Sequence, residues 1–386
     1  MKVAVTTLAF CVAALLALGM VMLYSSSMTQ GTQYLQMQLV WCTLGFICCV
    51  GVTSLDYQVL RKNAWLLFGA AVLLLVLVLV PHLPGPFHAL KIQTVSSHGA
   101  RRWFDIHGVR FQPSELGKIA LIIALAWYGD RFQRRMHTLT WGILLPVGII
   151  AVILGLVFRE PDRGTTILLA AVSGSMLLLA GVRWRFIVPP VILAAVGLTY
   201  SILHDPMRMK RIFSWLDLEQ NKEGVGYQAY QAMLALGSGG WNGLGLGNGL
   251  QKHGFVPENH TDFIFSVIGE ELGLVATLLI IVAFIILIFC GMHIAMRARD
   301  TFGMLLAAGI TLLIGCQAFI NIGVVTSALP NKGLPLPFIS YGGSNLLAML
   351  TCVGILFSVA RQAPVREKLP VSDASVSDNP FAAKAA

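Results

Sequence analysis

The chain has 386 residues, of which 56% are hydrophobic and 12% charged, and its mean hydropathy is +0.75. Soluble domains carry about twice that share of charged residues, so a soluble globular protein is excluded. The net charge of +9 resides largely in short loops between apolar runs, where membrane topology explains it better than a nucleic-acid partner does.

Ten apolar runs predict the secondary structure. Each is close to the length needed to cross about 30 Å of hydrocarbon as a helix, although the fourth is short and carries Glu115 and Lys118. Pro113, just ahead of that run, favours a helix start. The predicted fold class is an all-α polytopic membrane protein with about ten transmembrane helices. The runs are 3–24, 35–54, 64–80, 114–128, 141–158, 165–181, 186–202, 263–290, 303–327 and 341–360.

The charges of the loops predict the orientation of the chain. With the N-terminus inside, every short inner loop is basic, as the positive-inside rule requires. Both termini are then cytoplasmic, and residues 203–262 form a large extracytoplasmic loop between helices 7 and 8. The segment 362–386 is polar and poor in aromatic residues, so we expect a disordered cytoplasmic tail after one transmembrane domain at 1–361.

The first long outer loop, 81–113, mixes arginine with aromatic side chains. Arg101 and Arg102 stand directly before Trp103 and Phe104. Guanidinium groups form paired hydrogen bonds with phosphate oxygens, so this segment is a candidate site for an anionic phosphate at headgroup level. The alternative is ordinary anchoring at the membrane interface, and composition alone leaves both readings open.

The second long outer loop is the only polar region large enough to shape a pocket. It begins with a basic and aromatic stretch at 208–215, which is suited to lie along the headgroups of membrane lipids. Seven glycines follow within Gly237–Gly249 and permit the backbone to come close to a ligand or a helix. Their spacing matches no nucleotide-binding motif, so we expect this segment to line a cavity.

The sequence VPENHTDFIFSVIGEE gives the strongest indication of a site. Glu258, His260 and Asp262 fall within five positions, and the apolar run that follows carries Glu270 and Glu271 into bilayer depth. Ionisable groups in such places are costly and usually face a cavity, a partner charge or a substrate. The alternative is a solvated loop end followed by buried structural carboxylates.

A further outer segment, LPNKGLPLPFISYGGSN, begins at Leu329 and leads into the last helix. Its three prolines forbid a regular helix. Lys332 and Tyr341 place polar groups at the outer surface, and Lys332 is a candidate substrate-binding residue.

Several long motifs, in order along the chain, resemble one family. The motifs GARRW…QPSELGK, EPDRGT, GYQAYQAMLALGSGG, GLGLGNGLQKHGFVPENHTDFIFSVIGEELG and LPNKGLPLPFISYGGSN are similar to signatures of the SEDS proteins RodA, FtsW and SpoVE. The resemblance runs from about residue 12 to residue 361. The runs GLGNGLQK and NKGLPLPFISYGG are more similar to FtsW, the division enzyme, whereas FDIHGVRFQPSE is close to RodA. One departure is Asn345, where the family usually has Ser.

This resemblance implies an activity. Family members are peptidoglycan glycosyltransferases that polymerise lipid II at the outer face of the bacterial inner membrane, with a class B penicillin-binding protein and other divisome proteins as partners. Asp262 matches the family's essential aspartate, which we expect to be the catalytic base. The resemblance also implies a divalent cation, Mg²⁺ or Mn²⁺, although the residue spacing in this sequence does not match a metal-binding motif. The expected substrate-binding residues are Arg101, Arg102, Lys118, Glu258, His260 and Lys332.

Structural roles are the alternative for several of these residues. Glu115 and Lys118 are three apart on one helix face and would simply pair with each other. Glu258 and His260 would cap a loop end. Three other functions stay open for the chain: a RodA-like elongation polymerase, a lipid II flippase and a non-catalytic divisome scaffold. A flippase needs polar residues on both sides of the membrane, and a scaffold would tolerate the loss of Asp262.

Overall fold

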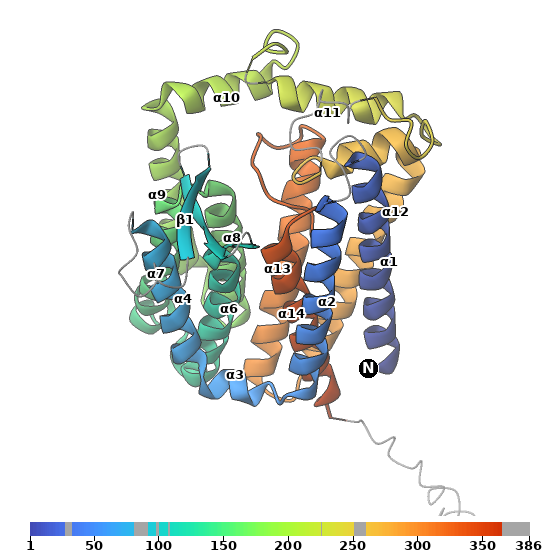
Figure 1. Ribbon diagram of the computed structural model, residues 1–386. Coiled ribbons are helices and arrows are strands. Elements are labelled where there is room, and N and C mark those ends of the chain that lie inside the picture. Colours follow the sequence, from blue (N-terminus) through green and yellow to red (C-terminus); the bar gives the residue numbers. More distant parts are fainter. Residues whose placement is uncertain are drawn as a thin grey trace, which may run out of the picture.

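The structure is a computed structural model that describes residues 1–27, 33–80, 92–97, 100–106, 109–224, 226–250 and 260–364. Within these residues, every one of the ten apolar runs forms a helix (Figure 1). The predicted tail falls almost wholly outside them, so the domain boundary at 361 stays a prediction. The helices that match the runs are α1 (Lys2–Ser26), α2 (Gln33–Ser54), α4 (Ala64–Leu79), α6 (Pro113–Arg131), α7 (Leu145–Arg159), α8 (Arg163–Leu179), α9 (Trp184–Leu203), α12 (Ile264–Met296), α13 (Thr301–Val325) and α14 (Gly343–Arg361).

The helices support a polytopic membrane protein. In the described part of the chain, seven helical stretches are long and apolar enough to cross a membrane: α1, α2, the stretch 140–159 that includes α7, α9, α12, α13 and α14. Helices α4 and α8 are apolar but have only 16 and 17 residues, and α6 carries charged residues at both ends. The polytopic helical fold class is therefore confirmed, whereas the number of ten spans stays a prediction.

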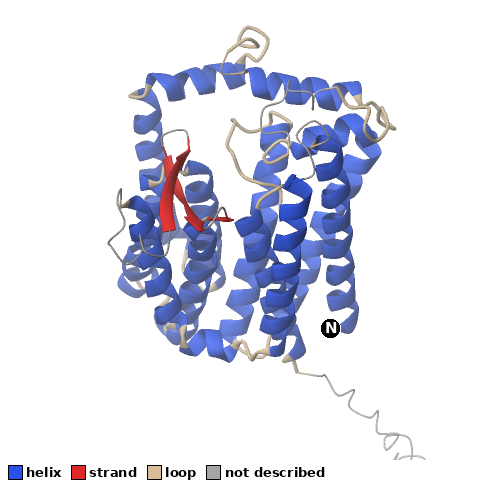
Figure 2. Ribbon diagram, viewed as in Figure 1, coloured by secondary structure: helices blue, strands red, loops and turns tan. Residues whose placement is uncertain are grey.

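A small sheet in the first outer loop departs from the all-α expectation. Strands β1 (Ile92–Ser97), β2 (Ala100–Ile106) and β3 (Val109–Phe111) form an antiparallel sheet in the order β1-β2-β3, drawn in red in Figure 2. The strands are short and β2 begins with two arginines, so the sequence reads as a polar loop. Burial of Phe104 of β2 against Val78 of α4 supplies an apolar contact that only the tertiary structure provides.

The large loop between α9 and α12 is partly helical. Helix α10 (Pro206–Leu216) and helix α11 (Tyr227–Ser238) lie across the end of the bundle opposite the N-terminus (Figure 1). Helix α11 packs against α12, and α10 packs against the end of α9. These two helices therefore cover this end of the bundle, which is predicted to be the outer one.

Helix α13 is at the centre of the bundle. It packs against α12, α6 and α8, and most of its residues are buried. Helix α14 packs along α2, and α1 packs along α12. In contrast, the described side chains of α9 are exposed or only partly buried, and this helix lies at the edge of the bundle (Figure 1). The residues that could position a site rigidly are therefore those on α6, α13 and α14.

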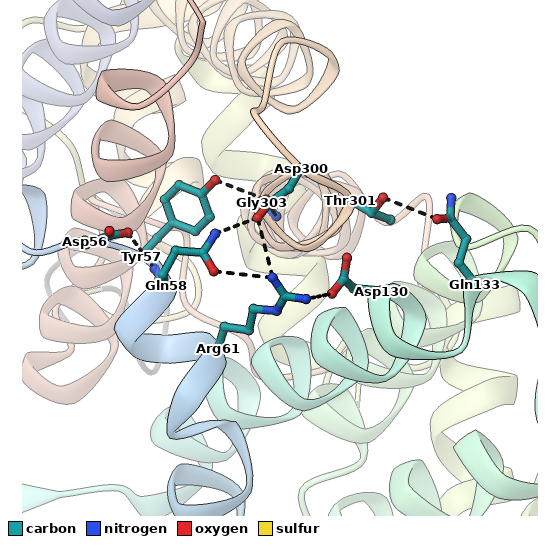
Figure 3. A network of polar contacts seen from close by, with 9 residues as sticks. All are labelled: Asp56, Tyr57, Gln58, Arg61, Asp130, Gln133, Asp300, Thr301 and Gly303. Carbon is teal, nitrogen blue, oxygen red and sulfur yellow. Dashed lines mark hydrogen bonds and ion pairs between the residues drawn. The ribbon is translucent and has the colours of Figure 1, made fainter.

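A polar network ties three segments together at the end of the bundle where the N-terminus lies (Figure 3). Arg61, in the short helix α3 (Gln58–Lys62), forms an ion pair with Asp130 at the end of α6. Its guanidinium also lies 3.9 Å from Asp300, which caps α13. The hydroxyl of Tyr57 donates to Asp300 over 3.0 Å. This end is predicted to be cytoplasmic, and the network holds its loops together.

Cysteine labelling tests the predicted orientation. Gln220 is exposed between α10 and α11, and Gln133 is exposed in a short turn after α6. In a background without the seven native cysteines, all of which are free, a Cys at position 220 should react with an impermeant reagent on spheroplasts. A Cys at position 133 should react only after the membrane is permeabilised, because it stands in a basic loop. Equal labelling of the two would overturn the orientation.

Candidate active site

Asp262 lies at the edge of a cavity at the end of the bundle opposite the N-terminus, which is predicted to be the outer end. It immediately precedes Phe263, the N-cap of α12, and it is partly exposed. The cavity has a volume of about 660 Å³. Its lining comes from β2, α10, α11, the start of α12 and the loop after α13. The lining residues are Arg102, Met207, Arg211, Ser214, Trp215, Gly226, Gln228, Ala229, Asp262, Phe263, Ser327, Leu329, Asn331 and Gly333.

Backbone contacts hold Asp262 from two sides. The side-chain amide of Asn321, on α13, donates to the carbonyl of Asp262 over 2.8 Å and to the carbonyl of Leu334 over 2.6 Å. The amide of Tyr341 donates to the carbonyl of His260 over 2.9 Å. The short segment before α12 is therefore fixed against both α13 and the loop between α13 and α14 that contains Pro330, Pro335 and Pro337, hereafter the proline-rich loop.

Gly333 lies directly beside the carboxylate of Asp262. A Cβ atom at Gly333 would lie 2.5 Å from Oδ2 of Asp262, which is closer than real Cβ contacts allow. On its other side this loop touches the first turn of α8, where a Cβ atom on Gly164 would meet the carbonyl oxygen of Gly333 at 3.4 Å. The proline-rich loop thus fills the space between Asp262 and α8, and glycine at position 333 leaves room for the carboxylate.

Arg102 reaches the cavity from β2 but is not simply a free cation. Its Nε donates to the carbonyl of Glu160 over 2.7 Å and its Nη2 to the carbonyl of Pro161 over 2.8 Å. Arg102 therefore ties the sheet to the turn between α7 and α8, and a guanidinium has five N–H donors, so others remain for a ligand. The side chain of Arg101 lies outside the described part, so its predicted role is untested.

Glu160, in the same turn, is a fully buried carboxyl group. Neither of its carboxylate oxygens has a hydrogen-bond partner among the described residues. Burial raises the pKa of Glu160 to about 8, with a further rise from the neighbouring charge of Asp162 and an opposing effect of Arg102. The group is therefore mainly protonated at neutral pH, and Arg102 keeps its positive charge unopposed by it.

Replacing Glu160 with Gln should remove a pH dependence of stability. The ordinary pKa of this carboxyl is 4.5 and the folded-state pKa is about 8, so between these values the folded protein binds a proton that the unfolded chain does not. The wild type should therefore lose stability as pH rises through this window. Thermal unfolding at about pH 5 and about pH 9 should show Glu160→Gln gaining stability over wild type mainly at the higher pH. A difference that does not change with pH would contradict the assignment.

Lys118 is buried in the bundle and does not line the cavity. Its Nζ lies 2.8 Å from Oε2 of Glu115 and donates to Oε1 of Gln317 over 3.1 Å. Glu115 also accepts from Nδ2 of Asn345 over 3.1 Å. Lys118 is only 1% exposed, so the arrangement matches the pairing alternative, and direct contact with substrate stays a prediction. Asn345, the departure from the family pattern, adds a donor to this buried pair.

Helix α12 is broken at Gly273, where the backbone has φ 76° and ψ −173°. At the break, the amides of Leu244 and Gly245 donate to the carbonyls of Glu270 and Glu271, each over 2.9 Å. The break frees these carbonyls from the α-helical pattern, and amides of the glycine-rich loop, Gly237–Gly249, replace the helix amides as their donors. The predicted continuous helix 263–290 is therefore interrupted.

The carboxylates of Glu270 and Glu271 hold the same glycine-rich loop. Glu271 accepts from the hydroxyl of Ser25, at 2.6 and 2.8 Å, and from the amide of Gly247 over 3.0 Å. Glu270 accepts from the amide of Leu250 over 2.8 Å. Ser25 stands near the C-terminal end of α1, so Glu271 lies close to that end of the bundle. The depth of Glu270 and Glu271 in the bilayer stays a prediction.

The other candidate residues are placed as follows. The ring of His260 lies 4.7 Å from that of Tyr34 and 5.9 Å from that of Tyr341, so it packs in an aromatic cluster. Lys332 is partly exposed between Asn331 and Gly333, both of which line the cavity. Glu258 lies outside the described residues. Direct substrate contacts of these residues stay predictions.

The described residues offer no preformed metal site for the expected divalent cation. Across the described residues, no three His, Cys, Asp or Glu side chains are grouped as metal ligands. Mg²⁺, however, is commonly held by one or two carboxylates together with substrate phosphates. Asp262 fits this mode as the carboxylate of the cavity wall, so the expected cation stays a prediction that this site can accommodate.

Sequence reasoning missed several residues of the cavity. Arg211 and Trp215 were expected to lie along lipid headgroups, but both line the cavity. The indole Nε1 of Trp215 donates to the carbonyl of Ser327 over 2.9 Å, which fixes the ring. Asn321 gave no sequence signal, since it is one polar residue in an apolar run. Gln228 in α11 and Asn331 in the loop after α13 gave no signal either, since isolated amides are common in helices and loops.

Comparisons with known proteins agree with this fold. The family model for FtsW, RodA and SpoVE, described as cell cycle protein, matches residues 6–364. A probable peptidoglycan glycosyltransferase FtsW of Trichlorobacter lovleyi is 42% identical and covers 90% of this chain and 91% of the relative. The protein of the same description from Geobacter metallireducens is 39% identical over 90% of this chain and 92% of the relative.

Two solved structures are similar over nearly the whole chain. A chain of a peptidoglycan synthase complex, studied for the coordination of polymerization and crosslinking, aligns with a TM-score of 0.78 and 28% identity and covers 92% of this chain and 97% of its own. The rod shape determining protein RodA of Thermus thermophilus aligns with a TM-score of 0.67 and 28% identity, covering 93% and 97%. The helical bundle described above is therefore a known arrangement.

Proposed function

This chain belongs to the FtsW, RodA and SpoVE family of cell cycle proteins, and from that membership we propose that it is a peptidoglycan glycosyltransferase that polymerises lipid II into glycan strands. The observation that carries the proposal is the carboxylate of Asp262 in the wall of an outer cavity that also presents Arg102 and Arg211. A carboxylate and two guanidinium groups suit a donor sugar linked to a diphosphate.

The chemistry of the donor explains why one carboxylate is sufficient. Diphosphate is a weak base, so it leaves without the general acid that glycoside hydrolysis needs. The bond between the anomeric carbon and the diphosphate oxygen breaks, and the acceptor hydroxyl oxygen forms the new bond to that carbon. Asp262 takes the hydroxyl proton as general base. Its place at the start of α12 favours the negative charge this role requires.

The arginines are placed to stabilise the leaving group. Arg102 and Arg211 approach the cavity from different elements, β2 and α10, so a diphosphate between them would be held from two sides. Charge that develops on the diphosphate in the transition state is stabilised by such preorganised donors. A bound divalent cation would neutralise further charge on the same phosphate oxygens when Asp262 and the substrate hold it.

Other residues of the lining suit the sugar. Trp215 offers an aromatic surface whose orientation is fixed by its bond to Ser327. The amides of Gln228 and Asn331 lie close together, with Nδ2 of Asn331 3.5 Å from Oε1 of Gln228. Planar amides can both donate to and accept from sugar hydroxyls. A saccharide would therefore rest between an apolar face and polar edges, as ligands in most small-molecule sites do.

Partners and cellular role follow from the relatives. The similar chain belongs to a peptidoglycan synthase complex in which polymerization and crosslinking are coordinated, which supports a crosslinking partner. We propose that this partner is a class B penicillin-binding protein with transpeptidase activity. The FtsW relatives support septal synthesis during cell division over elongation. We extend this proposal to assembly with other divisome proteins, to residence in the bacterial inner membrane and to cytoplasmic termini.

A flippase is the second candidate function. The contacts between loops at the predicted inner end of the bundle disfavour it. A translocation path would need an opening there, whereas Arg61, Asp130 and Asp300 tie the inner loops together (Figure 3). Between the two ends, α6 and α13 are packed and buried over most of their length. The outer cavity, with its carboxylate, is better suited to chemistry than to transport.

Reconstitution tests the proposal directly. The purified protein, with and without its transpeptidase partner, is mixed with lipid II and assayed for glycan strands. We expect strands from the wild type in complex with the partner. Liposomes that carry lipid II on the inner leaflet provide the flippase assay in parallel. Translocation without strand synthesis would replace the proposed function with the transporter, and neither activity would favour the scaffold.

A further inference from the structure

Two amide side chains on α13 link the active-site segment to the buried centre of the bundle. Asn321 donates from its one Nδ2 atom to the carbonyls of Asp262 and Leu334, at 2.8 and 2.6 Å. One turn earlier, Gln317 donates from Nε2 to the carbonyl of Pro335 over 2.9 Å. The same Gln317 accepts from Nζ of Lys118 through Oε1 over 3.1 Å.

We propose that Asn321 is a positioning residue for the glycosyltransferase reaction: it sets the place of Asp262 relative to the proline-rich loop, and Gln317 joins this arrangement to the Glu115–Lys118 pair. The proposal rests on the proposed function, because Asp262 needs positioning only if it acts on a substrate. Asn321 itself touches no reacting atom and is therefore not a catalytic residue.

The donor pattern explains why an asparagine suits this position. An amide nitrogen carries two hydrogens, and both are used on carbonyl oxygens that belong to different segments. Turning the amide over would place Oδ1 against the same two oxygens, so the orientation is determined. Asn321 is 2% exposed, and its Oδ1 has no hydrogen-bond partner among the described residues. An aspartate would fit the space but would bring oxygen against oxygen.

Both partners of Asn321 meet at the catalytic carboxylate. Leu334 directly follows Gly333, whose added Cβ atom would lie 2.5 Å from Oδ2 of Asp262. A small shift of either segment therefore changes the space that the carboxylate occupies. Misplacement of a catalytic group by about 1 Å can cost about 100-fold in rate. Asn321 restrains the two segments together with a single side chain.

The polar contacts of Gln317, one turn before Asn321, restrain the part of α13 that carries Asn321. Helix α13 is at the centre of the bundle, and Gln317 joins it to Lys118 on α6. Asn345 of α14 completes the group by donating to Glu115. Three buried helices thus share one network, and Asn321 lies one turn beyond its member Gln317 on α13. This arrangement accounts for a buried lysine that does not line the cavity.

The test compares Asn321→Leu and Asn321→Asp with the wild type, Asp262→Asn and a control, Ser358→Ala. Ser358 is buried and donates to the carbonyl of Leu55 over 2.7 Å, so its loss removes a similar bond between distant segments, α14 and the end of α2, away from the cavity. Each protein is purified with its transpeptidase partner. Thermal unfolding, kcat and KM for lipid II polymerisation are measured.

We expect both Asn321 variants to fold and bind the partner, with kcat reduced about 30- to 100-fold and KM within a few-fold of wild type, because the substrate contacts are kept while the base is displaced. Ser358→Ala should lose some thermal stability and keep its kcat. A kcat within about 3-fold of wild type for a folded Asn321 variant would overturn the positioning role, as would an equal loss in Ser358→Ala.

The remaining outcomes also distinguish a failure of the positioning role from a failure of the proposed function. If neither Asn321 variant is recovered folded, the residue is required for folding and the positioning claim falls. If the wild type is active, Asp262→Asn is inactive and the Asn321 variants are fully active, only this inference fails. If the wild type makes no glycan with its partner, the proposed function fails and takes this inference with it.

Discussion

Asp262→Asn should abolish glycan synthesis from lipid II while leaving the fold intact. The substitution keeps the size of the side chain and most of its hydrogen bonding, but an amide cannot accept the proton of the acceptor hydroxyl. Loss of a general base typically reduces the rate about 10²- to 10⁴-fold. The contact from Asn321 goes to the backbone carbonyl of residue 262, so it is unaffected by the change. The rate of strand formation by the purified complex is the measurement.

A matched control separates chemistry from surface charge. Glu219 is an exposed carboxylate in the same outer loop and does not line the cavity. Glu219→Gln should polymerise lipid II at the rate of the wild type. Near-normal strand synthesis by Asp262→Asn would remove the base from the mechanism. Normal cell division supported by an inactive Asp262→Asn protein would instead favour the scaffold function.

Gly273→Ala should strongly destabilise the protein at the α12 break. The backbone at Gly273 has φ 76° and ψ −173°, a region that is essentially restricted to glycine and costs other residues about 1–3 kcal/mol. A Cβ atom there would also lie 2.4 Å from the amide nitrogen of Gly243 and 2.5 Å from the carbonyl oxygen of Trp241. Those atoms belong to backbone and cannot rotate away. We expect a total cost of at least about 3 kcal/mol, seen as a large drop in the unfolding temperature.

Gly155→Ala provides the comparison. Gly155 lies inside α7, and an added Cβ atom would meet nothing within 4 Å. Alanine in a helix interior is favoured over glycine by about 0.5–1 kcal/mol, so this variant should be slightly more stable than the wild type. If Gly273→Ala unfolds at the temperature of Gly155→Ala, the contact between the glycine-rich loop and the broken helix does not exist as described.

The break also accounts for the two glutamates. Glu270 and Glu271 lie just before the break and are buried, so their carboxylates and carbonyls need polar partners. The break turns their backbone carbonyls and carboxylates toward the glycine-rich loop, whose amides satisfy them. Buried carboxylates are tolerated when they are hydrogen-bonded. Their role is therefore to anchor the loop that leads into the segment before Asp262.

Much of the helical architecture could be predicted from the sequence, because a membrane helix is a local structure. Every backbone group in the hydrocarbon must be satisfied within its own segment, so a run of about twenty apolar residues is nearly sufficient to define a helix. The ten runs found in this way all form helices. Asp262 could be singled out as well, since its polar neighbours and its motif lie together in the sequence.

The partners of the side chains were decided only by the tertiary structure. Lys118 was expected near substrate, but the packing of α6 against α13 places it beside Gln317. Arg102 donates to backbone carbonyls of the turn after α7. Trp215, on α10, lines the cavity. The sheet at 92–111 and the break at Gly273 depend likewise on contacts between distant segments. Hydropathy along the chain indicates whether a segment will be buried in the bundle or the membrane. The partner of a given side chain depends on how separate helices pack. For Asn321, this packing joins residues 59 positions apart in the sequence.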